Sequence, residues 1–165
     1  MPELANISKL LHVAIAFWFV GGLLGRTLAQ RQARRSEEIM VVDALCGLAG
    51  AFDRLLVIPG AQLVLVVGIV TALLQGYPLL GFLQGAQSNW LLVSLVLYVG
   101  ITALVPTVFL PTGRTFDAAL TKAREAGRVT GELTAALHDR RTAWAHRGEL
   151  AAVAAIIVLM VLKPF

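Results

Sequence analysis

Residues 90–110 read WLLVSLVLYVGITALVPTVFL and contain no charged side chain. A helix rises about 1.5 Å per residue, so a helix of this length crosses a hydrocarbon core about 30 Å thick. Two other apolar runs, at 10–28 and 55–74, have similar lengths. A fourth run at 150–162 is shorter, and it becomes a span if its helix begins near Thr142. The sequence therefore predicts four transmembrane helices.

The whole chain is treated as one membrane domain. Of its 165 residues, 58% are hydrophobic and 15% are charged, with a mean hydropathy of +0.78. A soluble domain usually has about 45–50% apolar and about 25% charged residues. The predicted fold class is an all-α, polytopic membrane four-helix bundle over 1–165. Its four spans are at about 10–28, 55–74, 90–110 and 145–162. The cytoplasmic links are at 29–54 and 111–144.

Arginine and lysine are concentrated on one side of the predicted membrane. The links at 29–54 and 111–144 and the ends of the spans beside them carry all the basic residues except Lys9 and Lys163. The positive-inside rule places these links in the cytoplasm and both termini outside it. Basic residues placed in this way indicate topology, and no nucleic-acid partner is expected. The predicted location is the bacterial cytoplasmic (inner) membrane, with the lipid bilayer as the main partner. Arg26 and the arginines after it indicate a retained helix and argue against a cleaved signal peptide.

Two link segments have helical character of their own. The apolar part of 36–52 is too short to cross a membrane, so it extends the second helix below the membrane or lies along its surface. Pro59 is expected to kink that helix. Residues 115–147 are interpreted as a cytoplasmic helix with mixed charges, which Gly127 and Gly131 weaken.

His12 is the candidate metal- and cofactor-binding residue. An ionisable side chain inside a span is a functional candidate, and neutral imidazole is a good axial ligand for haem iron. The alternative is an interfacial histidine bonded to water, a lipid headgroup or a carbonyl. His146 begins the last span at the opposite face, so it cannot share an iron with His12. His138 lies among charged residues and is expected to be solvated.

Other residues have mainly structural interpretations. Gly21, Gly22 and Gly25 form a small-residue patch that is expected to let helices pack closely, and Gly21 and Gly25 have the GxxxG spacing. Asp53 and Arg54 open the second span and are expected to pair with each other or with another helix end. Glu149, at the inner end of the last span, is either a paired carboxylate or part of a proton relay. No catalytic residue is assigned.

A family resemblance rests on short motifs in all four spans. These are LLHVAIAFWFVGGLLGR at 10–26, DRL at 53–55 followed by Pro59 and Gly68, the span led by Trp90, RGE at 147–149, and LKPF at 162–165. Together they resemble the HemJ-type protoporphyrinogen oxidases and, more loosely, the copper-resistance protein D membrane domains. A large set of uncharacterised four-helix bacterial membrane proteins has the same layout.

The resemblance implies a bundle that holds b-type haem partly through the histidine of the first helix, a position that His12 matches. It also implies a lysine four residues after the tryptophan of the third helix, needed for oxidase activity, where this chain has Ser94. The tryptophan of the first helix, Trp18, stands six residues after His12 where the family has seven. The chain is therefore interpreted as a relative without oxidase activity.

Two functional hypotheses follow from the sequence. The first is a small membrane protein that binds haem b through His12 for electron transfer or haem handling. The second is an accessory or structural subunit without a cofactor, packed through the glycine face of its first helix into a larger membrane complex or a homo-oligomer.

Overall fold

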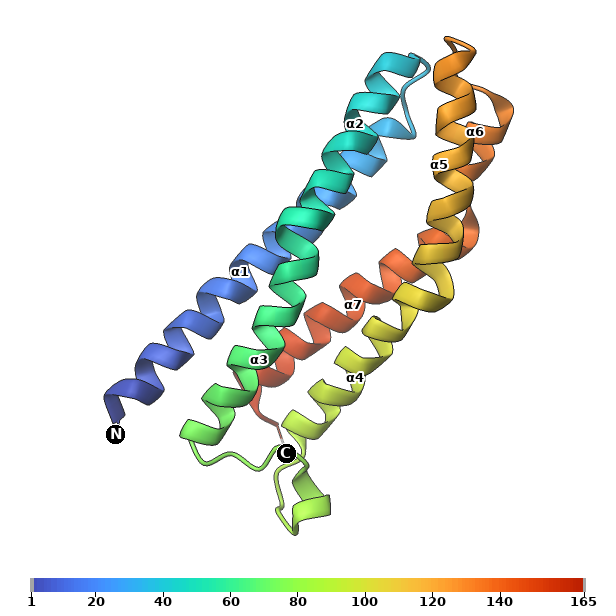
Figure 1. Cartoon of the computed structure of the whole chain (residues 1–165). Helices are drawn as coiled ribbons and strands as arrows, with labels where there is room; N and C mark the ends of the chain where they lie inside the picture. Colours follow the sequence, from blue (N-terminus) through green and yellow to red (C-terminus); the bar gives the residue numbers. More distant parts are fainter. Residues whose placement is uncertain (1, 165) are drawn as a thin grey trace.

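The computed structural model describes residues 2–164, and the regular structure within them is entirely helical. Four helical stretches are long and apolar enough to cross a membrane, as predicted: Glu3–Ala33, Ile39–Leu74, Trp90–Glu125 and Gly131–Leu162. In chain order the elements are α1 (Pro2–Ala33), α2 (Ile39–Phe52), η1 (Asp53–Val57), α3 (Ile58–Leu74), η2 (Gly81–Gln84), α4 (Trp90–Leu104), η3 (Val105–Phe109), α5 (Leu110–Glu125), α6 (Gly131–Leu137) and α7 (Arg140–Leu162) (Figure 1).

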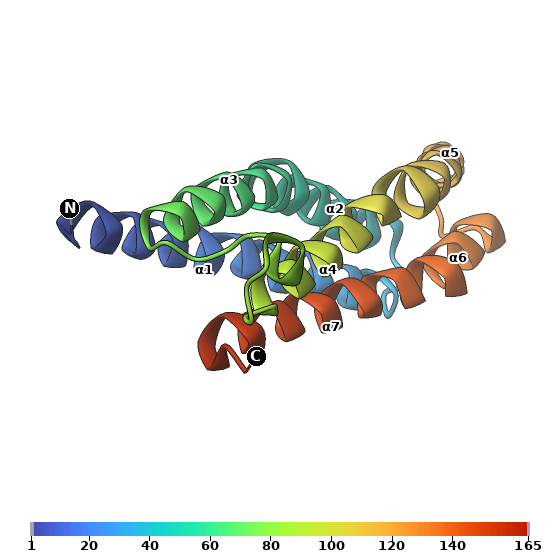
Figure 2. The same cartoon turned by 90° about the horizontal axis from the view of Figure 1, so that it is seen from below.

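The helices form two antiparallel hairpins. In the first hairpin, α1 packs along α2, η1 and α3; in the second, α4 packs against α7 and α5 against α6. Both termini lie at one end of the molecule, and α5 and α6 lie at the other (Figures 1 and 2). This arrangement agrees with an even number of spans. The side on which the termini lie stays a prediction from the basic links.

Most residues of the predicted links between the spans are also helical. Residues 36–52 mostly form α2, which continues through η1 into α3, so this segment extends the second helix and does not lie along the surface. The helix expected over 115–147 is broken in the region where Gly127 and Gly131 weaken it. Gly127, with a φ of +64°, ends the α5 segment, and a second break separates α6 from α7, which begins at Arg140. A positive φ suits glycine because it has no Cβ.

Two spans contain a π-helical turn directly before a proline. Pro59 lacks an N–H and its ring crowds the carbonyl of Leu55, four residues earlier, so the α-helical hydrogen-bond pattern cannot continue. The chain widens instead, and the Ile58 N–H donates to the carbonyl of Asp53, five residues earlier. In the same way, the N–H of the residue before Pro111 donates to the carbonyl of Val105. The kink expected at Pro59 therefore takes the form of η1, and η3 is its counterpart in the third span.

The outer surface of the helices is suited to lipid. Large apolar side chains are widely exposed along the spans, including Leu10 at 71% and Phe17 at 76% in α1 and Val161 at 72% in α7. A soluble monomer rarely exposes contiguous apolar surface on this scale, because water would not solvate it favourably. These faces therefore lie against hydrocarbon chains.

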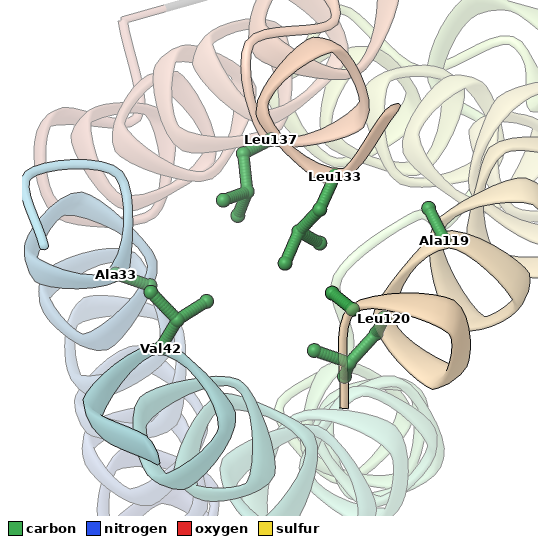
Figure 3. Close-up of a cluster of buried hydrophobic side chains, with 7 residues drawn as sticks. Ala33, Val42, Ala119, Leu120, Leu133 and Leu137 are labelled. Carbon is green, nitrogen blue, oxygen red and sulfur yellow. The ribbon is translucent and has the colours of Figure 1, made fainter. Parts of the chain in front are cut away.

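Two apolar clusters join the hairpins. The first lies at the end away from the termini, which the basic links predict to be cytoplasmic. It contains side chains from four helices that point toward one another (Figure 3): Ala33, Val42, Ala119, Leu120, Ala123, Leu133 and Leu137. The second lies within the spans and contains Phe19, Leu23, Val57 and Val153. Arg124 adds an ion pair beside the first cluster, where its Nε donates to Asp43 at 2.8 Å. The helical extensions at this end thus form a small core of their own.

At the opposite end, the last residues of α7 are tied to the α3–α4 connection. The Nζ of Lys163 donates to the hydroxyl of Tyr77 at 2.6 Å and lies 4.4 Å from the centre of its ring. Tyr77 in turn meets Trp90 edge-on, with their ring centres 5.3 Å apart. Trp90, the first residue of α4, is 6% exposed and packs inside this group.

Asp139 caps the start of α7, and its removal is expected to destabilise the protein by about 1 kcal/mol at neutral pH. Its carboxylate accepts hydrogen bonds from the backbone N–H and the hydroxyl of Thr142, both at 2.8 Å, and these bonds lower its pKa. Because the folded-state pKa lies below the unfolded one, the stabilisation is present above the unfolded pKa. It is lost as pH falls through the folded pKa.

Thermal unfolding of Asp139→Ala in detergent across the acidic range measures this effect. The deficit relative to the parent should be present at neutral pH and should shrink as the solution becomes acidic. Asp117→Ala, which removes an exposed carboxylate from α5, is the control and should show no such deficit. An equal loss in both variants would contradict a capping role.

Candidate functional site

A cluster of charged side chains bridges the two hairpins at the end of the spans away from the chain termini. Arg26 of α1 is 4% exposed. Its Nη1 donates to Asp53 Oδ1 at 2.9 Å, and its Nη2 donates to Glu149 Oε2. Asp53 belongs to η1 of the first hairpin, whereas Glu149 belongs to α7 of the second. The guanidinium of Arg26 therefore holds carboxylates from both hairpins.

His146 adds a group that can gain or lose a proton. One turn before Glu149 on α7, its Nδ1 lies 3.4 Å from Glu149 Oε2. Its ring stacks on Phe109 of η3, with ring centres 4.6 Å apart and planes inclined by 21°. We refer to Arg26, Asp53, Glu149, His146 and Phe109 as the Arg26 cluster.

The charges of the Arg26 cluster do not balance unless a proton is added. Arg26 carries one positive charge and the two carboxylates carry two negative charges. With His146 neutral the sum is −1, and with His146 protonated it is zero. The side chains of Arg26 and Glu149 are 5% and 7% exposed, so water screens the imbalance poorly, whereas the Asp53 side chain is 34% exposed. The cluster thus has a buried core and one edge that water reaches.

Both π-helical turns contribute to this cluster. Asp53 is the first residue of η1 and Phe109 is the last residue of η3. Widened turns of this kind occur frequently at functional sites in helical proteins. Here each one presents a side chain from a proline-containing span to the Arg26 cluster.

The sequence interpretation identified the members of this cluster separately but did not assemble them. Asp53 pairs with Arg26 and not with its neighbour Arg54, whose Nε donates to the carbonyl of Gly50 on an exposed face. Glu149 is indeed a paired carboxylate. The signal that could have indicated the pairing is Arg26 itself, a permanent charge inside an apolar run that requires a buried partner.

His12 lies far along α1 from the cluster and faces α3. Because α1 begins at Pro2, His12 lies well inside the helix. It is nevertheless close to the start of the predicted membrane span at residue 10. A Cβ added at Gly68 would meet the ring, 2.9 Å from Cε1 and 3.3 Å from Nδ1, so the missing side chain makes room for the imidazole. Nδ1 is buried and has no hydrogen-bond partner among residues 2–164.

Haem ligation by His12 stays a prediction, and the structure shows its imidazole packed against α3 at Gly68. In the described part of the chain, no three histidine, cysteine or carboxylate side chains come together as a metal-binding group. Ser94, at the position of the lysine implied by the resemblance, is 4% exposed and donates to the carbonyl of Trp90 at 2.8 Å.

The glycines of α1 pack within the chain. A Cβ at Gly22 would lie 2.6 Å from the Cβ of Leu56, and one at Gly25 would lie 2.7 Å from the ring of Phe52. Gly21 has open space beside it. The close approach therefore uses Gly22 and Gly25 against the second helix, whereas the GxxxG pair predicted from the sequence was Gly21 and Gly25.

Comparison with protein families gives one match, over residues 6–164, to a family described as predicted integral membrane protein (DUF2269). This match supports an uncharacterised membrane family and gives no support to the resemblance to the HemJ-type oxidases or the copper-resistance protein D domains. Searches of curated proteins and of solved structures found no match. Because the family match covers nearly all of the chain and the fold has four membrane-spanning helices, the chain belongs to the DUF2269 family of multi-pass integral membrane proteins.

Proposed function

We propose that the protein is a proton-linked membrane protein, in which the Arg26 cluster gains or loses a proton and thereby sets how the two hairpins pack. The observation that supports this proposal is the charge imbalance, one buried arginine against two carboxylates with His146 beside them. Ionisable groups in a span are costly to keep and usually serve a function.

Protonation of the cluster changes the attraction between the hairpins. Two unit charges about 4 Å apart interact by roughly 4 kcal/mol at an effective dielectric constant of 20, which is comparable with the stability of a small domain. When His146 is protonated, Arg26 and His146 together neutralise Asp53 and Glu149. When His146 is neutral, the surplus negative charge weakens the contact. Asp53, the most exposed charged member, gives water access to the cluster.

The distance between the hairpins should therefore depend on pH. Spin labels at Leu48 and Thr121, exposed positions on α2 and α5, would report this distance in a Cys46→Ser protein reconstituted in nanodiscs. We expect the distance distribution to change between acidic and neutral pH, because a proton on the cluster cancels its surplus negative charge. Glu149→Gln should abolish the change, and His146→Gln should do the same.

Glu132→Gln is the matched control for the distance measurement. It also converts a carboxylate to an amide in the second hairpin, but at an exposed pair with Lys122 in which each side chain is 64% exposed. The pH response should survive in this variant. A parent protein that shows no response, or a response that persists in Glu149→Gln, would overturn the proposal.

A second candidate function is binding of b-type haem through His12, favoured by the buried and unpaired Nδ1 of that residue. Haem bound there would supply one-electron redox chemistry for electron transfer or haem handling. His12 would hold the iron from one side, and Gly68 leaves the space that its ring needs. The location proposed for either function is the bacterial cytoplasmic membrane.

An absorption spectrum tests the haem candidate. Protein expressed with a haem supply and then purified should show a Soret band that His12→Ala removes without removing the protein from the membrane. A featureless spectrum would exclude the haem candidate and favour the accessory-subunit hypothesis. That hypothesis in turn requires the chain to leave native membranes in a complex under gentle solubilisation, and free monomer would contradict it.

A further inference from the structure

A separate polar pocket lies at the cytoplasmic end of α1. It has a volume of about 440 Å³ and lies between the turn that joins α1 to α2 and the C-terminal part of α6. The polar side chains that line it are Arg34, Arg35, Ser36, Glu37, Thr134 and His138, and we call it the Arg34 pocket. It shares no residue with the Arg26 cluster.

The guanidinium groups of the Arg34 pocket form no hydrogen bond with the described residues. The Nε of Arg34 is buried and has no hydrogen-bond partner among the described residues. Over the same residues, neither Arg34 nor Arg35 forms an ion pair, whereas Arg26 and Arg124 do. A buried N–H without a partner is costly, and native structures usually satisfy it with a ligand, an ion or water.

The remaining polar groups complete an environment for an anion. His138 Nδ1 lies 3.0 Å from the carbonyl oxygen of Thr134, and since a carbonyl only accepts, Nδ1 carries the hydrogen. Nδ1 is therefore already used, and Nε2 is the ring nitrogen that remains for a ligand. Glu37 is the one carboxylate in the lining, opposed by two arginines. The net charge of the pocket is therefore positive.

The position of the pocket suits a phosphate group. Arg34 stands six residues after the predicted end of the first span at 28, or about 9 Å along the helix. Headgroups occupy about 5–8 Å on each side of the hydrocarbon core. The pocket therefore lies where the headgroup layer meets the cytoplasm and can be reached from both. Guanidinium groups match phosphate oxygens through paired hydrogen bonds, better than ammonium groups do.

We propose that the Arg34 pocket is a binding site for a phosphate group, held by Arg34 and Arg35 with His138 beside it. The phosphate could belong to an anionic phospholipid of the inner leaflet or to a soluble phosphate, and the two sources share this recognition chemistry. The volume is within the range of small-ligand sites, so it admits the phosphate with a small organic group attached.

Two arms of one experiment distinguish the sources. In the first, full-length protein is purified in detergent with phosphatidylglycerol or phosphatidylcholine, and bound lipid is counted by native mass spectrometry. In the second, inorganic phosphate is titrated onto protein in phosphatidylcholine nanodiscs, and thermal stability is followed. Retention of phosphatidylglycerol without a response to inorganic phosphate assigns the site to lipid. A saturable response to inorganic phosphate assigns it to a soluble ligand.

Variants test the assignment to Arg34. Arg34→Gln should weaken the binding by about tenfold or more, because it removes a charged donor and the buried N–H together. Arg34→Lys keeps the charge and loses the Nε donor, so its affinity for the phosphate group should be intermediate. Binding by this variant would show that a change at residue 34 does not prevent folding. Arg31→Gln is the matched control, an exposed arginine of α1 outside the pocket, and should bind like the parent. Equal losses in Arg31→Gln and Arg34→Gln, or no binding in either arm, would overturn the proposal.

Discussion

Arg26→Ala is expected to lower the free energy of unfolding by about 3–5 kcal/mol, because it leaves two carboxylates without their shared cation in a poorly hydrated site. Most of the loss in stability should come from Glu149, because its side chain is only 7% exposed and water cannot replace the lost cation. The loss is comparable with the net stability of many small domains, so the variant should unfold at markedly lower denaturant. Unfolding of the purified protein in mixed micelles, followed by circular dichroism, measures it.

Two further variants separate the charge effect from a general loss of packing. Arg54→Ala removes a neighbouring arginine that is exposed, and it should change stability by no more than about 0.5 kcal/mol. Replacing the three charges together, as Arg26→Met, Asp53→Asn and Glu149→Met, should recover much of the loss, since a buried ion network can be exchanged for apolar packing. If the triple variant has a lower free energy of unfolding than Arg26→Ala, unpaired carboxylates are not the cause of the loss in Arg26→Ala.

Gly22→Ala is expected to destabilise the first hairpin by about 1–3 kcal/mol through overpacking. The added methyl would lie 2.6 Å from the Cβ of Leu56 and 3.3 Å from the backbone nitrogen of Val57. Neither atom is the end of a flexible side chain, so α1 and η1 must move apart. The same micelle unfolding measurement should show a lower midpoint.

Gly21→Ala is the control on the adjacent residue. Space beside Gly21 is open, and alanine is a better helix former than glycine by about 1 kcal/mol, so this variant should match or exceed the parent in stability. If Gly21→Ala is the more damaging of the two, the open face of Gly21 is covered by a partner in the membrane, as the accessory-subunit hypothesis would require.

The spans could be predicted from the sequence because length and apolarity are local properties. The stretch at 90–110 is sufficient by itself to identify a membrane helix. The continuation of the helices beyond the membrane was harder to predict, since 36–52 could equally have lain on the surface. Its position follows from Val42, which is fully buried in the cytoplasmic apolar cluster, a contact that no local pattern reveals.

The assembly of the candidate site could not be predicted from the sequence, because it depends on contacts between residues far apart in the chain. Arg26 and Glu149 are 123 positions apart, and their contact exists only once both hairpins have formed and packed. The sequence placed Asp53 and Glu149 at the ends of spans and Arg26 among the basic residues that indicate topology, and it gave no reason to join them. The sequence placed His146 and His12 at opposite ends of the spans, as the structure does, yet the stacking of His146 on Phe109 depends on the widened turn at η3.

The two π-helical turns, η1 and η3, also set the rotation about the helix axis of the residues before each turn relative to the residues after it. Each residue of an α-helix advances the side chain by about 100°, so a turn that holds an additional residue offsets every position before it from every position after it. Deleting one residue from η1, with Pro59 replaced by alanine, would turn α2 by about that angle relative to α3. Val42 would leave the cytoplasmic core, and Asp53 would leave Arg26. The spacing of η1 therefore sets the register between the cytoplasmic core and the membrane-embedded helices.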